Sequence, residues 1–241
     1  MDQTKRQITL VSFFRFNPGE RLWGMKQMMV TQNRMKGTEG LVFHKMLGTG
    51  GGAGYSSRPD FGTYALLSVW ETQTLAESFE SASEVMDDFR KHAFELYSIF
   101  LSPIQSRGLW SGKQPFKPEQ ADPDNARIVV LTRATLKPRY YIQFWKRVGR
   151  VSQSHVGSPG LLFSKGVGER PWIMQATFSI WRSVDEMTAF AHKKDGTHFE
   201  AIQTTRRLKG FREELYARFQ PLGTKGSWFG KDPVGDALKD R

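Results

Sequence analysis

Apolar positions along the chain fall into two series of short segments that occur in the same order. The first series opens with the apolar stretch at 8–16 and the second with the stretch at 128–135. Later in each series an apolar segment ends on tryptophan, at 64–70 and again at 174–181. Strand-like segments of this length, alternating with amphipathic stretches, predict the order β-α-β-β-α-β for each half.

Short motifs repeat in step with these segments. The stretch 40–45 reads GLVFHK and the stretch 160–165 reads GLLFSK. Each half closes on glycine and tryptophan, at 108–110 and at 226–228. Because the order of these motifs is the same in both halves, we interpret the chain as an internal duplication.

Each strand that ends on tryptophan is followed by a predicted helix. A capping box, in which a hydroxyl and an acidic side chain three residues later satisfy the first free N–H groups, marks its start. We place these boxes at Thr74 with Glu77 and at Ser183 with Glu186.

The repeated β-α-β-β-α-β order is the ferredoxin-like pattern of the α+β class. One such unit covers only one face of its antiparallel sheet, and the other face is too apolar to meet water. We therefore expect two tandem repeats that bury these faces together, as in a dimeric α+β barrel. The expected boundaries are 1–112 for the first repeat, 113–126 for a polar linker and 127–241 for the second repeat.

The two halves differ most at a glycine-rich stretch, 48–54, which has no counterpart of equal length in the second half. Its spacing lacks the Gly-x-Gly-x-x-Gly order and the following Lys-Ser/Thr that a phosphate-binding loop needs. We interpret it as a lid or a rim over the barrel.

The second departure from the repeat is Asp195-Gly196-Thr197-His198, which interrupts a helix of the second half. Thr197 with Glu200 forms a third predicted capping box and restarts the helix. His198 then shares a mostly apolar face with residues one turn further along, so it is expected to point inward. A neutral imidazole there can donate one nitrogen to iron, or be a satisfied core histidine.

Composition narrows the chemistry. The chain has no cysteine, which excludes disulfides, cysteine-ligated zinc, iron–sulfur clusters and a thiolate-ligated haem. No apolar run approaches the roughly 20 residues of a membrane span, and no signal-peptide core follows Met1. We expect a soluble, cytoplasmic protein, with peripheral contact with the inner membrane left open.

The formal net charge of +11 comes from scattered lysines and arginines. Such scatter is explained by a solvated basic surface. The alternative interpretation is an anionic binding partner, either an anionic lipid or an acidic electron donor. No nucleic-acid-binding motif is present, so we expect no nucleic-acid partner.

Four arginines are candidates for a functional site. Arg15 and Arg133 lie inside apolar strands, where they either face a cavity and act on a bound group or project from the outer side. Arg107 and Arg218 are weaker cases of the same kind.

Several stretches together resemble the spheroidene monooxygenase family of acyclic carotenoid 2-ketolases, and the resemblance extends over nearly the whole chain. The most specific are the Asp-Gly-Thr-His stretch, FREELYARF at 211–219 and GKDP at 230–233. Others are FFRF at 13–16, RLW at 21–23, RGLWSG at 107–112, LTRAT at 131–135 and TFSIW at 177–181.

The resemblance implies a haem-dependent monooxygenase that converts C-2 of a linear carotenoid to a ketone. Its partners would be dioxygen, a hydrophobic substrate and a ferredoxin-type electron donor. It makes His198 the proximal ligand of a haem b iron. By their place in the strands, and not by the resemblance, Arg15 and Arg133 are the candidate catalytic residues, which would pair with a propionate or polarise a bound oxygen, and Arg107 and Arg218 are the candidate cofactor-binding residues.

Other functions fit the same scaffold. A haem-dependent dehydratase acting on an N–O bond, a non-catalytic haem-binding protein and a cofactor-free monooxygenase are the alternatives. The substrate, the distal residues and the oligomeric state, including a homo-oligomer, stay open.

Overall fold

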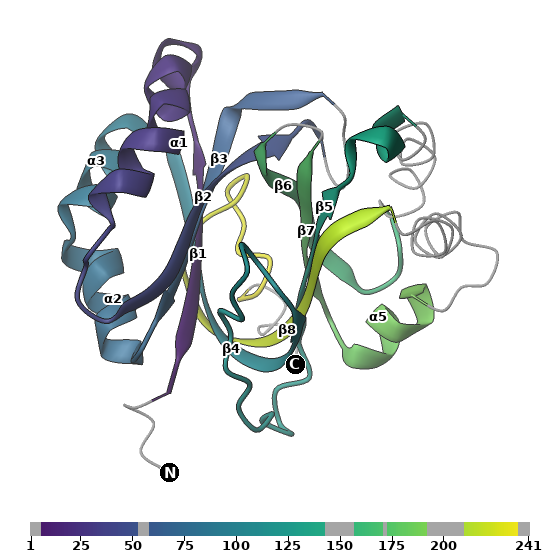
Figure 1. The fold of residues 1–241 in the computed structure, drawn as a ribbon. Helices are drawn as coiled ribbons and strands as arrows, with labels where there is room; N and C mark the ends of the chain where they lie inside the picture. Colours follow the sequence, from purple (N-terminus) through teal and green to yellow (C-terminus); the bar gives the residue numbers. More distant parts are fainter. Residues whose placement is uncertain (1–5, 53–57, 143–156, 171–172, 192–209, 236–241) are drawn as a thin grey trace.

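A computed structural model describes residues 6–52, 58–142, 157–170, 173–191 and 210–235. Figure 1 shows a closed barrel with helices on two opposite sides. Its strands are β1 (Ile8–Arg15), β2 (Leu41–Gly50), β3 (Pro59–Trp70), β4 (Glu95–Gly108), β5 (Ile128–Leu136), β6 (Leu161–Arg170), β7 (Met174–Trp181) and β8 (Phe211–Gly226). Its helical elements are η2 (Pro18–Glu20), α1 (Arg21–Arg34), α2 (Gln73–Ala82), α3 (Glu84–His92), η3 (Pro138–Tyr140) and α5 (Val184–Ala191).

The strand order around the barrel is β1-β3-β2-β6-β7-β5-β8-β4, and every neighbouring pair is antiparallel. The first four strands form a sheet in the order β4-β1-β3-β2, and the last four repeat that order as β8-β5-β7-β6. The sheets join where β4 pairs with β8 and β2 pairs with β6. This arrangement confirms the predicted fold class of two ferredoxin-like repeats packed as a barrel.

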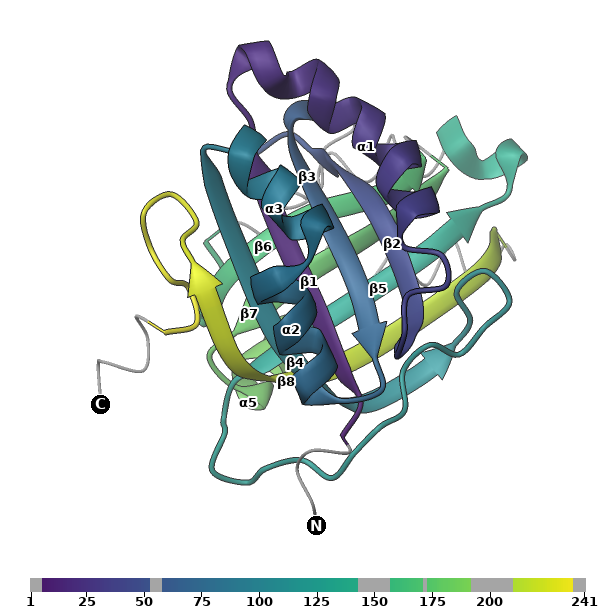
Figure 2. The same ribbon diagram turned by 90° about the vertical axis from the view of Figure 1, so that its left-hand side faces the viewer.

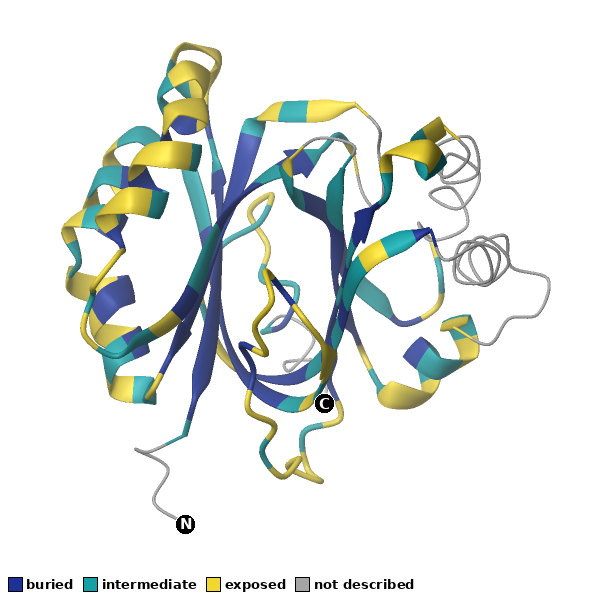
Figure 3. Cartoon of the chain, in the orientation of Figure 1, coloured by how far each residue is buried: buried dark blue, intermediate teal, exposed yellow. Residues whose placement is uncertain are grey.

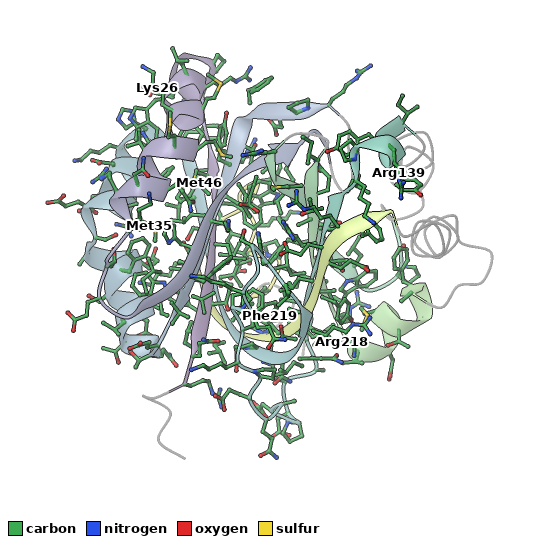
Figure 4. The ribbon with its side chains drawn as sticks, viewed as in Figure 1. Lys26, Met35, Met46, Arg139, Arg218 and Phe219 are labelled. Carbon is green, nitrogen blue, oxygen red and sulfur yellow. The ribbon has the colours of Figure 1, made fainter. Side chains whose placement is uncertain are left out.

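The barrel interior is filled by aromatic side chains from both sheets. Alternate residues of each strand point inward, so Phe13, Phe163 and Phe178 meet there with ring centroids 5.2 to 6.1 Å apart. Figure 3 shows the strands as the main buried part of the chain. In Figure 4 Phe219 lies within the barrel, whereas its neighbour Arg218 lies toward the outer side.

The outer face of the first sheet is covered by three helices. Figure 2 shows α1, α2 and α3 lying across this sheet. Phe14 stacks on Phe89 of α3 at 3.9 Å, and Met46 and Leu66 belong to the same buried cluster. The helices thus supply the apolar cover that the alternating pattern of the strands requires.

One predicted helix start is wrong and one is confirmed. Thr72, not Thr74, caps α2, because its hydroxyl accepts a hydrogen bond from the Leu75 N–H. Ser83 ends α2 and caps α3, because its hydroxyl accepts a hydrogen bond from the Met86 N–H. Ser183 does precede α5 and accepts from the Glu186 N–H at 3.2 Å, as predicted. The third predicted box, at Thr197 and Glu200, lies outside the described residues.

None of the described helices combines the length and the apolar character needed to cross a membrane. Gly48 to Gly50 of the glycine-rich stretch belong to β2, and 53–54 lie outside the described residues. The linker at 113–126 and the repeat boundaries stay a prediction.

Candidate functional site

The outer face of the second sheet has small residues where the first sheet has large ones. The register makes the two sheets comparable, because Ile8 pairs with Trp70 in the first and Ile128 with Trp181 in the second. Three neighbouring outward positions hold Met46, Leu66 and Phe14 in the first sheet, and Gly166, Thr177 and Ala134 in the second. The second sheet therefore has smaller outward side chains in the place where the first sheet packs against its helices, and we call these three positions the recess.

Two hydroxyls in this recess have no hydrogen-bond partner. Ser164 Oγ and Thr177 Oγ1 are buried, and neither has a partner in the part of the chain that the structure describes. A buried hydroxyl without a partner is unfavourable, so such atoms mark places where another group is expected.

Arginines flank one edge of the recess. A cavity of about 340 Å³ is lined by Arg107, Thr132, Ala134 and Tyr216. The guanidinium of Arg107 lies 5.0 Å from the Tyr216 ring centre, and Arg218 Nε donates to the Tyr216 hydroxyl at 2.5 Å. Neither arginine forms an ion pair with a carboxylate of the described residues, so both are available to an anionic group.

The other end of this face is closed by α5. Trp181 packs on Phe190 with ring centroids 5.1 Å apart, and Met187 is buried in the same cluster. The recess is thereby limited to the half of the sheet near Ala134 and Thr177.

Arg133 and Arg15 lie elsewhere, on the inward side of the barrel. Arg133 is only 3% exposed and forms ion pairs with Glu213 and, at 3.8 Å, with Glu169. Arg15 forms an ion pair with Glu95. When the two repeats are aligned by strand register, Arg133 is equivalent to Phe13 and not to Arg15. Arg133 therefore lies deeper in the barrel than Arg15 does. A catalytic role for either arginine stays a prediction.

Backbone N–H groups from the opposite repeat hold two of these glutamates, Glu213 and Glu95. Glu213 accepts from the N–H groups of Ser111 and Gly112 at 3.0 and 2.8 Å. Glu95 accepts from Gly230 N at 2.8 Å. Burial raises the pKa of Glu213, but these hydrogen bonds and Arg133 outweigh it, so that the pKa lies below its usual value.

The sequence reasoning missed these two glutamates. The available signal was the repeated Gly-Trp motif, because the turns after Trp110 and Trp228 are the ones that donate to them.

The described histidines have protein partners. His44 Nε2 lies 3.0 Å from the Gln32 carbonyl oxygen. His92 stacks on Trp23 and lies 2.8 Å from Glu20. The described residues contain no cluster of three metal-binding side chains. His198, the predicted iron ligand, lies outside the described residues, as do His155 and His192.

Curated proteins similar to this chain carry one name. A spheroidene monooxygenase of Cereibacter sphaeroides is 40% identical over 236 residues, covering 98% of this chain and 73% of the relative. One from Rhodobacter capsulatus is 38% identical over 237 residues, covering 97% and 98%. The chain belongs to the spheroidene monooxygenase family. The membership confirms the resemblance inferred from the sequence motifs and makes the chain a monooxygenase, although no protein-family model matches it.

Solved structures confirm the fold of this member of the spheroidene monooxygenase family. An aldoxime dehydratase in complex with butyraldoxime superposes with a TM-score of 0.59 at 10% identity, covering 92% of this chain and 81% of the other. A second aldoxime dehydratase gives 0.58 at 11% identity, covering 90% and 82%. At these identities the likeness concerns architecture alone.

Proposed function

We propose that the protein is a haem-dependent monooxygenase that oxygenates a carotenoid-like substrate. The substrate class rests on the names of the relatives, which cover almost the whole chain. The recess of the second sheet carries the cofactor proposal, because a flat group can replace the packing that Met46, Leu66 and Phe14 provide on the first sheet.

The residues around the recess suit a haem in their chemistry. Arg107 and Arg218 supply cations without carboxylate partners among the described residues, as two propionates require. Ala134 and Gly166 occupy less volume above the strands than Phe14 and Met46 do at the corresponding positions of the first sheet. His198 is the proposed iron ligand, and a haem bound there would supply the activation of dioxygen. The surrounding sheet would keep water away from that reaction.

A haem-dependent dehydratase acting on an N–O bond is the second candidate. The architecture shared with aldoxime dehydratases favours it, whereas the identity of 38 to 40% with spheroidene monooxygenases favours oxygenation. The two differ in their need for dioxygen and for an electron donor. For oxygenation we propose a ferredoxin-type donor, whose acidic surface would match the net charge of +11.

An absorption spectrum of the purified protein, expressed with a haem precursor, tests the proposal. We expect a Soret band in the parent that is lost or displaced in His198→Ala, since that change removes the proposed iron ligand. His44→Ala is the matched control and should keep the band, because His44 bonds to the Gln32 carbonyl. A parent without a Soret band after haem titration would contradict the proposal.

A lipid-soluble substrate also requires access to a membrane, and α1 provides a surface for it. Leu22, Met25 and Met29 of this helix are exposed, Met29 by 71%. Lys26, on the outward side of α1 in Figure 4, adds a cation among them. We propose that this face rests on an anionic bilayer.

Replacing Leu22 and Met29 together by serine should lower co-sedimentation with phosphatidylglycerol vesicles several-fold, because it removes apolar area that would enter the bilayer. Ile142→Ser, at another exposed apolar position, should leave binding unchanged. Equal binding of both variants would refute a membrane role for α1.

A further inference from the structure

The barrel has two mouths with matching parts. In the second mouth, which we call the closed mouth, a carboxylate of the chain links a lysine to a tryptophan. Lys45 and Lys165 occupy corresponding positions on β2 and β6, and Trp110 and Trp228 begin corresponding turns. In the second mouth Glu169 accepts from Lys45 Nζ at 2.6 Å and from Trp110 Nε1 at 2.7 Å. Its carboxylate thus joins the lysine to the tryptophan.

The first mouth lacks that carboxylate. Thr49 takes the position of Glu169, because each of them lies four residues after the lysine and directly after the glycine at which β2 and β6 pair. The Thr49 hydroxyl donates to the Thr63 carbonyl instead. Trp228 Nε1 has no hydrogen-bond partner among the described residues. Lys165 Nζ is left with Asp60 at 3.3 Å and the Gly52 carbonyl at 3.2 Å.

A cavity occupies the space in front of these groups. It measures about 540 Å³ and includes Lys165, Trp228, Phe229, Phe94 and Arg15 in its lining. Phe94, Trp228 and Phe229 make part of its wall aromatic. The Arg15 guanidinium lies 3.7 Å from the Phe229 ring centre and 4.8 Å from that of Phe94.

The charge of this mouth favours an anion. Three cations, Arg15, Arg21 and Lys165, face two carboxylates, Asp60 and Glu95, which leaves a net charge of +1. Burial lowers the pKa of Lys165, and a nearby anion would offset that cost.

We propose that the first mouth binds a small carboxylate with a flat apolar body. The ligand carboxylate would take the place that Glu169 has in the second mouth, accepting from Lys165 Nζ and Trp228 Nε1, while the apolar body packs on Phe229 and Phe94. This site lies in the barrel rather than on the outer face of the second sheet. It goes beyond the proposed function and does not depend on haem.

Calorimetric titration with 2-naphthoate tests the site, and uncharged 2-naphthamide is the matched probe. We expect naphthoate to bind at least tenfold more tightly than the amide, because only the carboxylate is charged. Trp228→Phe removes the donor N–H but keeps a ring, and should weaken naphthoate binding about tenfold or more. Trp110→Phe makes the same change in the closed mouth and should leave the affinity unchanged.

A second variant tests the site by filling it. Thr49→Glu copies Glu169 into the first mouth, so it should compete with the ligand and lower naphthoate affinity at least tenfold. Naphthoate binding that matches amide binding, or that is equal in the parent, Trp228→Phe and Thr49→Glu, would overturn the proposal. All titrations are run on haem-free and haem-loaded protein, so that a failure of haem binding is recognised separately.

Discussion

Gly166→Leu should lower haem affinity by about tenfold to a hundredfold, because it restores a large side chain where the second sheet has its recess. Gly166 is buried on β6 and pairs with Thr177 of β7. The corresponding pair in the first sheet is Met46 with Leu66. Overpacking of a filled site costs about 1–3 kcal/mol, which is the source of that range. Haem titration followed at the Soret band measures it.

The matched control lies at the corresponding position of the first sheet. Met46→Ala should lower the free energy of unfolding by about 2–5 kcal/mol, since Met46 is buried against the helices, and should leave haem affinity unchanged. If a folded Gly166→Leu protein binds haem as tightly as the parent, the cofactor does not lie on this face.

Glu213→Gln should lower the free energy of unfolding by about 3 kcal/mol at neutral pH. The change removes the main carboxylate partner of Arg133, whose side chain is 2% exposed, and leaves that charge with Glu169 at 3.8 Å. It also weakens the acceptor for two backbone N–H groups of the turn after Trp110. Urea denaturation followed by circular dichroism measures the loss.

The corresponding change in the first mouth should cost less. Glu95→Gln removes the partner of Arg15, whose side chain is 21% exposed, so water compensates part of the lost interaction and about 1 kcal/mol is expected. Equal losses for the two variants would show that the depth of the arginine does not govern the energy of the pair.

The pH dependence has a defined sign. The folded-state pKa of Glu213 is lowered, so its contribution to stability is complete above the unfolded value of about 4.3 and is lost as the pH falls toward the folded value. The difference in stability between the parent and Glu213→Gln should therefore shrink on acidification below about pH 5. A difference that stays constant down to pH 3 would contradict this account.

The sequence by itself determined the architecture of this protein. The repeated GLVFHK and GLLFSK motifs and the two strands ending at Trp70 and Trp181 were enough for two ferredoxin-like units, because strand alternation and motif order are local properties of the chain. The family could also be inferred from the sequence, since its motifs are contiguous.

Only the tertiary structure decided how the two halves differ. The recess became visible when the register placed Gly166, Thr177 and Ala134 opposite the positions of Met46, Leu66 and Phe14, which are far apart in sequence. The environments of Arg15 and Arg133 were likewise decided by strand register, because a shift of two residues keeps a side chain on the same face but changes its depth. Which mouth is closed depends on contacts between repeats, such as Lys45 with Glu169, and no local pattern encodes such contacts.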